Sequence, residues 1–259
     1  MKSLIKRNPL AVLFFTIFLD LLGFGILIPV IPQLLANPDS PFFLLPAGWS
    51  LDQGYVVLGV LTAMFPLAIF FAAPILGQLS DRFGRKPILA FSLAGTSIAH
   101  ALFGLGIVLR SIPLLFIARI FDGLTGGNFS VAQAAIADVT PPRERAKNFG
   151  LIGAAFGLGF IVGPYLGGRL SDPTLVSWFN AATPFWFAAL LSTVNTVLVF
   201  TVLPETHGMR NRNLTIAWSR AVKNIVHAFN LKHLRPLFTT VFIFQGGFSF
   251  YITFSSVFL

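Results

Sequence analysis

Seven long apolar runs limit what this chain can fold into. Each run holds about 20 or more mainly apolar residues, the length that an α-helix needs to cross a bilayer. A membrane β-barrel would show short alternating segments instead. We therefore expect an all-α membrane protein with helices over residues 9–35, 55–76, 87–109, 113–137, 149–170, 183–203 and 236–259.

The composition excludes several other classes of protein. Hydrophobic residues make up 55% of the chain and charged residues 10%, whereas a soluble domain has about 25% charged residues. The net charge of +9 is not a nucleic-acid signal, because a basic binding surface needs a soluble body to carry it. The chain has no Cys, which excludes disulfides and Cys-ligated metals, and we expect no metal or cofactor.

The basic residues predict how the chain crosses the membrane. Nearly all of the 18 Lys and Arg residues lie in the N-terminal segment and in every second loop, and the opposite loops hold only Arg110 and Arg169. Cytoplasmic loops are enriched in Lys and Arg, so the N-terminus is expected in the cytoplasm. Receptors of the rhodopsin type have the opposite orientation. The first run is also too long for a cleaved signal peptide, and we expect it to be retained.

The runs divide the chain into three regions. Residues 1–203 are expected to form a six-helix transmembrane bundle, and 236–259 the first helix of a second bundle. Between them, residues 204–235 form a basic cytoplasmic linker, in which 216–229 has the spacing of a short amphipathic helix. Because the last run continues to the end of the chain, we expect a longer protein with a C-terminal half that this chain lacks.

A charged loop with two glycines joins the second and third runs. It reads G-x-L-x-D-R-x-G-R-K, and its glycines are expected to let the chain turn sharply between antiparallel helices. A basic stop-transfer turn explains the cations but not the acidic residue or the glycine spacing. The loop resembles the signature loop of the major facilitator superfamily. Its specified residues are Gly77, Asp81, Arg82, Gly84, Arg85 and Lys86.

Glycines recur every four residues in the fifth run and therefore share one face. Small residues let helices approach closely in lipid, and a proline inside a helix permits a bend. Glycines at positions 153 and 157 add a related small ridge. The pattern G-x-x-x-G-P-x-x-G-G resembles the antiporter motif of the same superfamily, and we interpret it as a packing ridge that also serves as hinge and seal. Its members are Gly159, Gly163, Pro164, Gly167 and Gly168.

Two charges lie inside the fourth run. Each costs roughly 2.5–3.5 kcal/mol on membrane-insertion scales, and Arg119 and Asp122 are spaced to pair with each other. On a continuous helix Asn128 falls on the face opposite Arg119. The polar and small residues predicted on the Arg119 face, which we expect to line a substrate cavity, are Asp122, Gly126, Ser130 and Gln133.

The fourth run also carries a family resemblance. Arg119 with Gly123 resembles the fourth-helix motif of the superfamily, whose arginine is linked to proton coupling. The family usually has Gln where this chain has Asp122, which leaves a plain local salt bridge as the alternative. Asp138 ends this run at the cytoplasmic surface. The resemblance implies that Asp81, Arg85 and Asp138 form a charge cluster that latches the outward-open state.

Two further titratable residues lie within apolar runs. The segment around Asp20 looks like the first helix of proton-coupled drug antiporters, which carry an acidic residue there. A buried Asp bonded to a neighbouring helix is the alternative. His100, in the third run, is more often a packing residue than a proton switch, although His can serve as one. The proton-coupling candidates are therefore Asp20, His100, Arg119 and Asp122.

Segments 118–127, 137–140 and 145–150 look like the tetracycline-efflux branch of bacterial drug:proton antiporters. That branch has an acidic residue where this chain has Ala99, which leaves the substrate open. The resemblance implies a non-enzymatic, proton-coupled exporter of small amphipathic molecules, in a bacterial inner membrane, that works by alternating access. The alternatives are a facilitator or proton-coupled nutrient symporter of the same fold, and a non-transporting membrane fragment.

Overall fold

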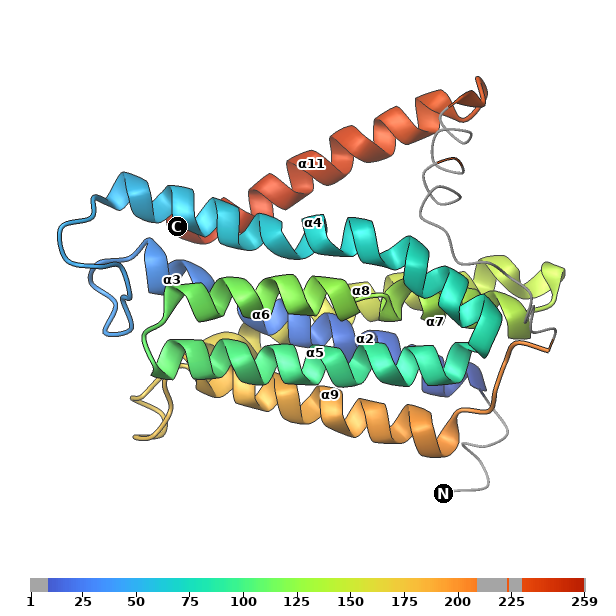
Figure 1. Cartoon of the computed structure of the whole chain (residues 1–259), viewed down its shortest axis with the longest axis horizontal. Helices are drawn as coiled ribbons and strands as arrows, with labels where there is room; N and C mark the ends of the chain where they lie inside the picture. The colour runs from blue at the N-terminus through green and yellow to red at the C-terminus, as the bar shows by residue number, and fades with distance from the viewer. Residues whose placement is uncertain (1–8, 209–222, 224–229, 259) are drawn as a thin grey trace.

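The computed structural model describes residues 9–208, 223 and 230–258, and no strand occurs among them (Figure 1). The predicted amphipathic helix over 216–229 lies outside these residues apart from position 223. The helices are α2 (Pro9–Leu27), α3 (Ile31–Leu35), α4 (Leu51–Phe83), α5 (Arg85–Val108), α6 (Ile112–Thr125), α7 (Asn128–Val139), the short 3₁₀ helix η1 (Pro142–Glu144), α8 (Arg145–Leu170), α9 (Thr183–Val202) and α11 (Arg235–Phe258).

The helices from α2 to α9 lie roughly side by side, and α11 leans away from them (Figure 1). α2 packs against α8 and α9, while α5 packs against α6 and α9. Arg85 begins α5 and Arg145 begins α8 at the same end of the bundle, whereas Arg110 and Arg169 lie in or beside loops at the other end. This separation agrees with the predicted orientation.

Five segments of the described chain are long and apolar enough to cross a membrane, and the fourth and seventh predicted spans are not among them. The prediction of one continuous helix over 113–137 is wrong, because α6 ends at Thr125 and α7 begins at Asn128. Gly126 and Gly127 separate the two helices. A Cβ atom on Gly127 would lie 2.7 Å from Cβ of Leu76 in α4, which is too close for two carbon atoms. Glycine at this position therefore lets the backbone pack directly against α4.

The predicted glycine ridge of α8 packs on α2. A Cβ atom on Gly163 would lie 2.7 Å from Cα of Gly25, and one on Gly159 would lie 2.8 Å from Cβ of Leu21. Gly167 approaches the backbone of Ile26 in the same way. The prediction was wrong for the second ridge and for Gly168, because none of the glycines at 153, 157 and 168 has a neighbour within 4 Å of such an atom.

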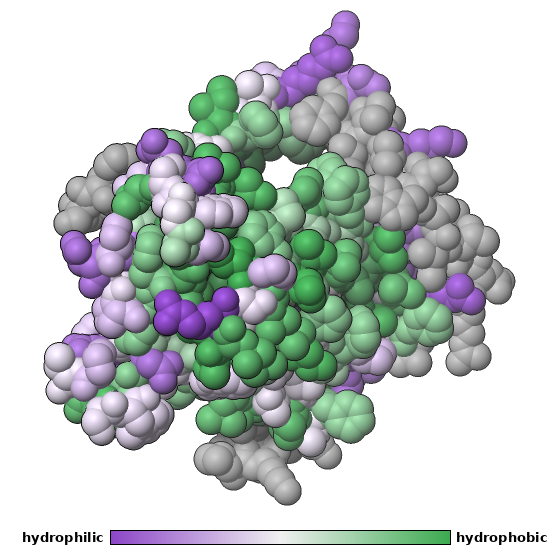
Figure 2. Space-filling view, turned by 60° about the vertical axis from the view of Figure 1, so that its left-hand side comes forward, coloured by the Kyte–Doolittle hydropathy of each residue, from purple (hydrophilic) through white to green (hydrophobic). Residues whose placement is uncertain are grey.

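Apolar side chains cover much of the outer surface of the bundle. Figure 2 shows one such face, with hydrophilic side chains gathered towards its edges. Large hydrophobic residues are exposed on α4, α5, α6 and α9, as lipid-facing helices require. Examples are Phe70, Ile98, Ile117, Leu190 and Phe200.

We predict that Gly163→Ala lowers the midpoint of thermal unfolding in detergent, because the new methyl group meets the α2 backbone. Overpacking of this kind costs about 1–3 kcal/mol. Gly168→Ala is the matched control, since it adds a methyl group to the same helix in open space and also improves helix propensity. Equal unfolding temperatures for the two variants would contradict the ridge.

Candidate functional site

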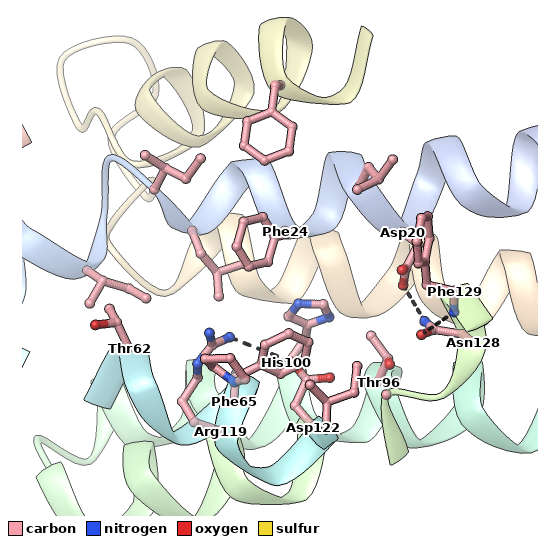
Figure 3. A pocket seen from close by; sticks show the side chains of 18 of the residues that line it. Asp20, Phe24, Thr62, Phe65, Thr96, His100, Arg119, Asp122, Asn128 and Phe129 are labelled. Atoms are coloured by element: carbon pink, nitrogen blue, oxygen red, sulfur yellow. Dashed lines mark hydrogen bonds and ion pairs between the residues drawn. The ribbon is translucent and has the colours of Figure 1, made fainter. Parts of the chain in front are cut away.

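A cavity of about 400 Å³ lies inside the bundle between α2, α4, α5, α6, α7 and α8, and α11 contributes to its lining (Figure 3). Its titratable groups are the four predicted proton-coupling candidates, Asp20, His100, Arg119 and Asp122. No group of His, Asp or Glu in the described chain is arranged to hold a metal. The aromatic lining consists of Phe24, Phe65, Phe129, Phe156, Phe160 and Phe248.

Arg119 and Asp122 form a buried pair on α6. Nη1 of Arg119 lies 3.6 Å from Oδ2 of Asp122, and the guanidinium carbon lies 4.9 Å from the ring centroid of Phe65. Within the described chain, neither Arg119 Nε nor Asp122 Oδ1 has a hydrogen-bond partner. Buried polar atoms are normally satisfied, so the cavity beside this pair suits a polar group of a ligand or water.

Asp20 meets a residue that the sequence placed on the wrong face. The Asn128 Nδ2 amide donates to Oδ1 of Asp20 at 2.5 Å, and both residues line the cavity with Arg119 (Figure 3). The prediction that Asn128 faces away from Arg119 is therefore wrong. It assumed a continuous helix, and the break at Gly126–Gly127 changes the register between α6 and α7.

The same break corrects the predicted cavity lining. Gly126 lines the cavity, but Ser130 and Gln133 do not. The Ser130 hydroxyl donates to the carbonyl oxygen of Gly127 instead, at 2.9 Å. These two positions were assigned from the angle that they would have on an unbroken helix.

Arg85 organises a second group of charges at the end of the bundle where α4 meets α5. Its guanidinium lies 2.6 Å from Oδ1 of Asp81 and 2.9 Å from Oδ2 of Asp138, and it also donates to Ser80 Oγ at 2.6 Å. The three residues of the predicted cluster therefore meet. We call Ser80, Asp81, Arg85 and Asp138 the latch.

The other members of the signature loop lie beside the latch. Gly84 makes the turn with a φ of 108°, which favours glycine, but Gly77 lies inside α4. The prediction that both glycines turn the chain is wrong for Gly77, because α4 continues to Phe83. Arg82 lies over the Phe83 ring and Lys86 faces the Phe200 ring, at 5.2 Å and 5.8 Å from the centroids.

The start of the linker folds back onto the latch, a contact that no sequence pattern predicts. Oε1 of Glu205 accepts the backbone N–H of Arg85 at 2.8 Å, where an acid favours the helix N-terminus. Nδ1 of His207 lies 3.4 Å from Oδ2 of Asp138. The available signal was an acidic residue directly after the sixth span, in a segment otherwise considered only for its basic charge.

Comparison with known proteins identifies the same family as the motifs do. The model of the Major Facilitator Superfamily matches residues 13–259. The class C tetracycline resistance protein of Escherichia coli is 36% identical over 243 residues, which is 93% of this chain and 56% of that protein. Major facilitator superfamily domain-containing protein 10 of Bos taurus is 31% identical over 217 residues, covering 78% of this chain and 45% of that protein.

Solved structures share the fold. The human organic anion transporter MFSD10 (TETRAN) superposes with a TM-score of 0.67 at 28% identity, over 84% of this chain and 53% of that chain. A D-xylose–proton symporter gives a TM-score of 0.61 at 19% identity, over 88% of this chain and 54% of that chain, which is a likeness of fold alone. The resemblance predicted from the motifs is confirmed, and the chain spans about half the length of these relatives.

Replacing Arg85 by Lys is expected to lower the thermal unfolding midpoint, because one ammonium group cannot keep the hydrogen bonds of a guanidinium to two carboxylates and a hydroxyl. Among these partners Ser80 is buried, and leaving a buried polar group unsatisfied costs about 1–3 kcal/mol. Arg82→Lys serves as the control in the same loop and should change the midpoint little. A larger effect at Arg82 would show that the latch is not what holds this end together.

Proposed function

The chain belongs to the Major Facilitator Superfamily, and from that membership we propose that it is part of a proton-coupled exporter of small amphipathic molecules that works by alternating access. The main support is the set of charged side chains inside a cavity in the middle of an apolar bundle. Charges in that position are expensive in a membrane and usually mark an ion or substrate pathway. Asp20, Arg119 and Asp122 are such charges.

The proton-coupling part rests on Asp20, with His100, Arg119 and Asp122 as the other participants. A carboxylate can take up and release a proton, and Asp20 has a hydrogen-bond partner suited to its ionised form in Asn128. Arg119 and Asp122 share the cavity with it, so a change in the charge of one group alters the field at the others. In an exporter, proton binding and substrate binding would compete for this enclosed space.

The substrate part rests on the mixture of surfaces around the cavity. Six phenylalanine side chains and several aliphatic ones offer apolar contact, and a few polar groups fix orientation, which is typical of sites for small molecules. An amphipathic molecule matches both kinds of surface. Among the relatives are tetracycline resistance proteins, and an efflux substrate is consistent with them.

The gating part rests on the latch and on the α8 ridge. We propose that the latch holds the cytoplasmic end closed and opens when the cavity turns inward, with the signature-loop residues Gly77, Arg82, Gly84 and Lys86 supporting it. Gly159, Gly163, Pro164 and Gly167 would serve as hinge and seal. The C-terminal half that this chain lacks would supply the other wall of the cavity, and the bacterial inner membrane is the proposed location.

In the complete transporter, we expect Asp20→Asn to abolish proton-linked efflux while the protein still reaches the membrane. The amide keeps the size of the side chain but cannot exchange a proton at neutral pH. Asp39→Asn, in the exposed loop before α4, is the matched control and should leave efflux unchanged. Export is measured as efflux from loaded whole cells, or as uptake into inside-out vesicles, with an amphipathic fluorescent substrate.

Collapsing the proton gradient distinguishes the proposal from its alternatives. An exporter driven by protons stops when the gradient is removed, whereas a facilitator continues to equilibrate its substrate and a symporter loses uptake instead of export. Wild-type efflux by Asp20→Asn would remove the coupling role from this residue.

A further inference from the structure

We infer that Asn128 is a positioning residue that senses the charge of Asp20 and, through α7, controls the latch. This inference rests on the proposed function and deepens it, because it assigns the link between the proton site and the cytoplasmic gate. Three observations carry it: the bonds of the Asn128 amide, the residue at the other end of α7, and the glycine break before α7.

The Asn128 side chain has two roles at once. Its Nδ2 donates to Oδ1 of Asp20, and its Oδ1 accepts the backbone N–H of Phe129 in the first turn of α7. An ionised carboxylate only accepts hydrogen bonds, so this arrangement fits the charged form of Asp20. The amide therefore joins Asp20 to the N-terminus of α7.

A proton on Asp20 weakens the first of these bonds. The carboxylic acid gains an O–H donor but keeps an acceptor oxygen, so the Asn128 amide can still donate to it while its own oxygen accepts Phe129 N–H. The bond between Asn128 and Asp20 is then no longer charge-assisted, and charge-assisted bonds are the stronger kind. The tie between α2 and α7 therefore weakens when Asp20 is neutral.

The far end of α7 carries a latch residue. α7 has 12 residues and is about 18 Å long, and Asp138 lies in its last turn, where it accepts from Nε of Arg85. A helix this short moves as one piece. Gly126, whose backbone is outside the helical region, and Gly127 separate it from α6, so α7 can tilt without moving the Arg119–Asp122 pair on α6.

The direction of the effect follows from the geometry. In the structure the Asn128–Asp20 hydrogen bond is present while the latch is closed. Loss of that hydrogen bond is therefore expected to loosen the latch. Protonation of Asp20 would then favour opening on the cytoplasmic side. This order suits an exporter, in which a proton taken up from outside must be released inside before the substrate leaves.

The experiment must separate the effect of Asp20 from that of other charged groups near Asp20 and the latch. Asp122, Arg119 and His100 face the cavity from α6 and α5. α8 carries its charges at its ends, and α9, also packed on α2, has none. His207 is an ionisable residue in direct contact with Asp138, so the experiment uses a His207→Asn background to remove that contact.

The test measures how accessible the latch is at different pH values. Ser80 is fully buried beneath Arg85, and this chain has no Cys. Any Cys in the rest of the complete transporter is replaced by Ser, so that Ser80→Cys supplies the one thiol, which is shielded while the latch is closed. The complete transporter, in inside-out vesicles without a pH gradient, is labelled with a membrane-impermeant maleimide at mildly acidic and mildly alkaline pH. Labelling rates are corrected for maleimide reactivity with a thiol exposed by denaturation.

The reference protein is expected to label about tenfold faster, relative to the denatured control, at acidic than at alkaline pH, which corresponds to about 1.4 kcal/mol. Asn128→Leu, which removes both hydrogen bonds, should label at the same corrected rate at both pH values. Asn128→Ser should behave likewise, because it keeps a polar residue at the start of α7 but its shorter side chain does not reach Asp20. Gln133→Leu removes an amide from the same helix outside the cavity lining and should keep the pH response.

A pH response that persists in both Asn128 variants overturns the inference, and so does its absence from the reference protein. Asp20→Asn should remove the response, and its retention would assign the sensor to another group and overturn the inference as well. Efflux is assayed separately. Proton-linked efflux together with labelling that ignores Asn128 leaves the proposed function standing without this link, whereas labelling that follows Asn128 in a protein without proton-linked efflux supports the link and removes the export proposal.

Discussion

The need to keep charged side chains away from lipid shapes this molecule. Arg119 and Asp122 are stable in a bilayer only if protein surrounds them, and the bundle provides that surrounding with apolar side chains turned outward and the two charges turned inward. The close contact of α8 with α2 serves the same end, because glycines let the two helices meet at backbone distance. The cavity is the space around these charged groups that apolar side chains do not fill.

Much of this arrangement could be predicted from the sequence, because its signals are either long or tightly spaced. Apolar runs of about 20 residues predict spans wherever they occur. The signature loop brought Asp81 and Arg85 together, and the repeat of Gly159 and Gly163 predicted a packing face. Each of these inferences depends on the spacing of residues close together in the sequence, and that spacing is independent of long-range contacts.

The wrong predictions concern positions where a contact with a residue distant in the sequence determines the backbone conformation. The fourth span reads as one helix because its composition is apolar throughout, but Gly127 lies against Leu76 of α4 and the helix breaks there. Every angle counted across the break was then wrong, which moved Asn128 into the cavity and Ser130 and Gln133 out of it. The contacts of Glu205 and His207 were missed for a related reason, because no local pattern shows where a connector folds back.

The attachment of Glu205 to the start of α5 has a mechanical consequence for the connector. The chain leaves α9 at Val202, and after the buried Leu203 it is fixed at Glu205 by the N–H of Arg85 on a different helix. A pull that reaches the bundle from α11 along the connector is therefore borne first by the contacts of His207 with Asp138 and of Glu205 with Arg85, and only afterwards by α9. The connector can also span a shorter distance than its number of residues suggests, because its first residues are held against the bundle and cannot extend.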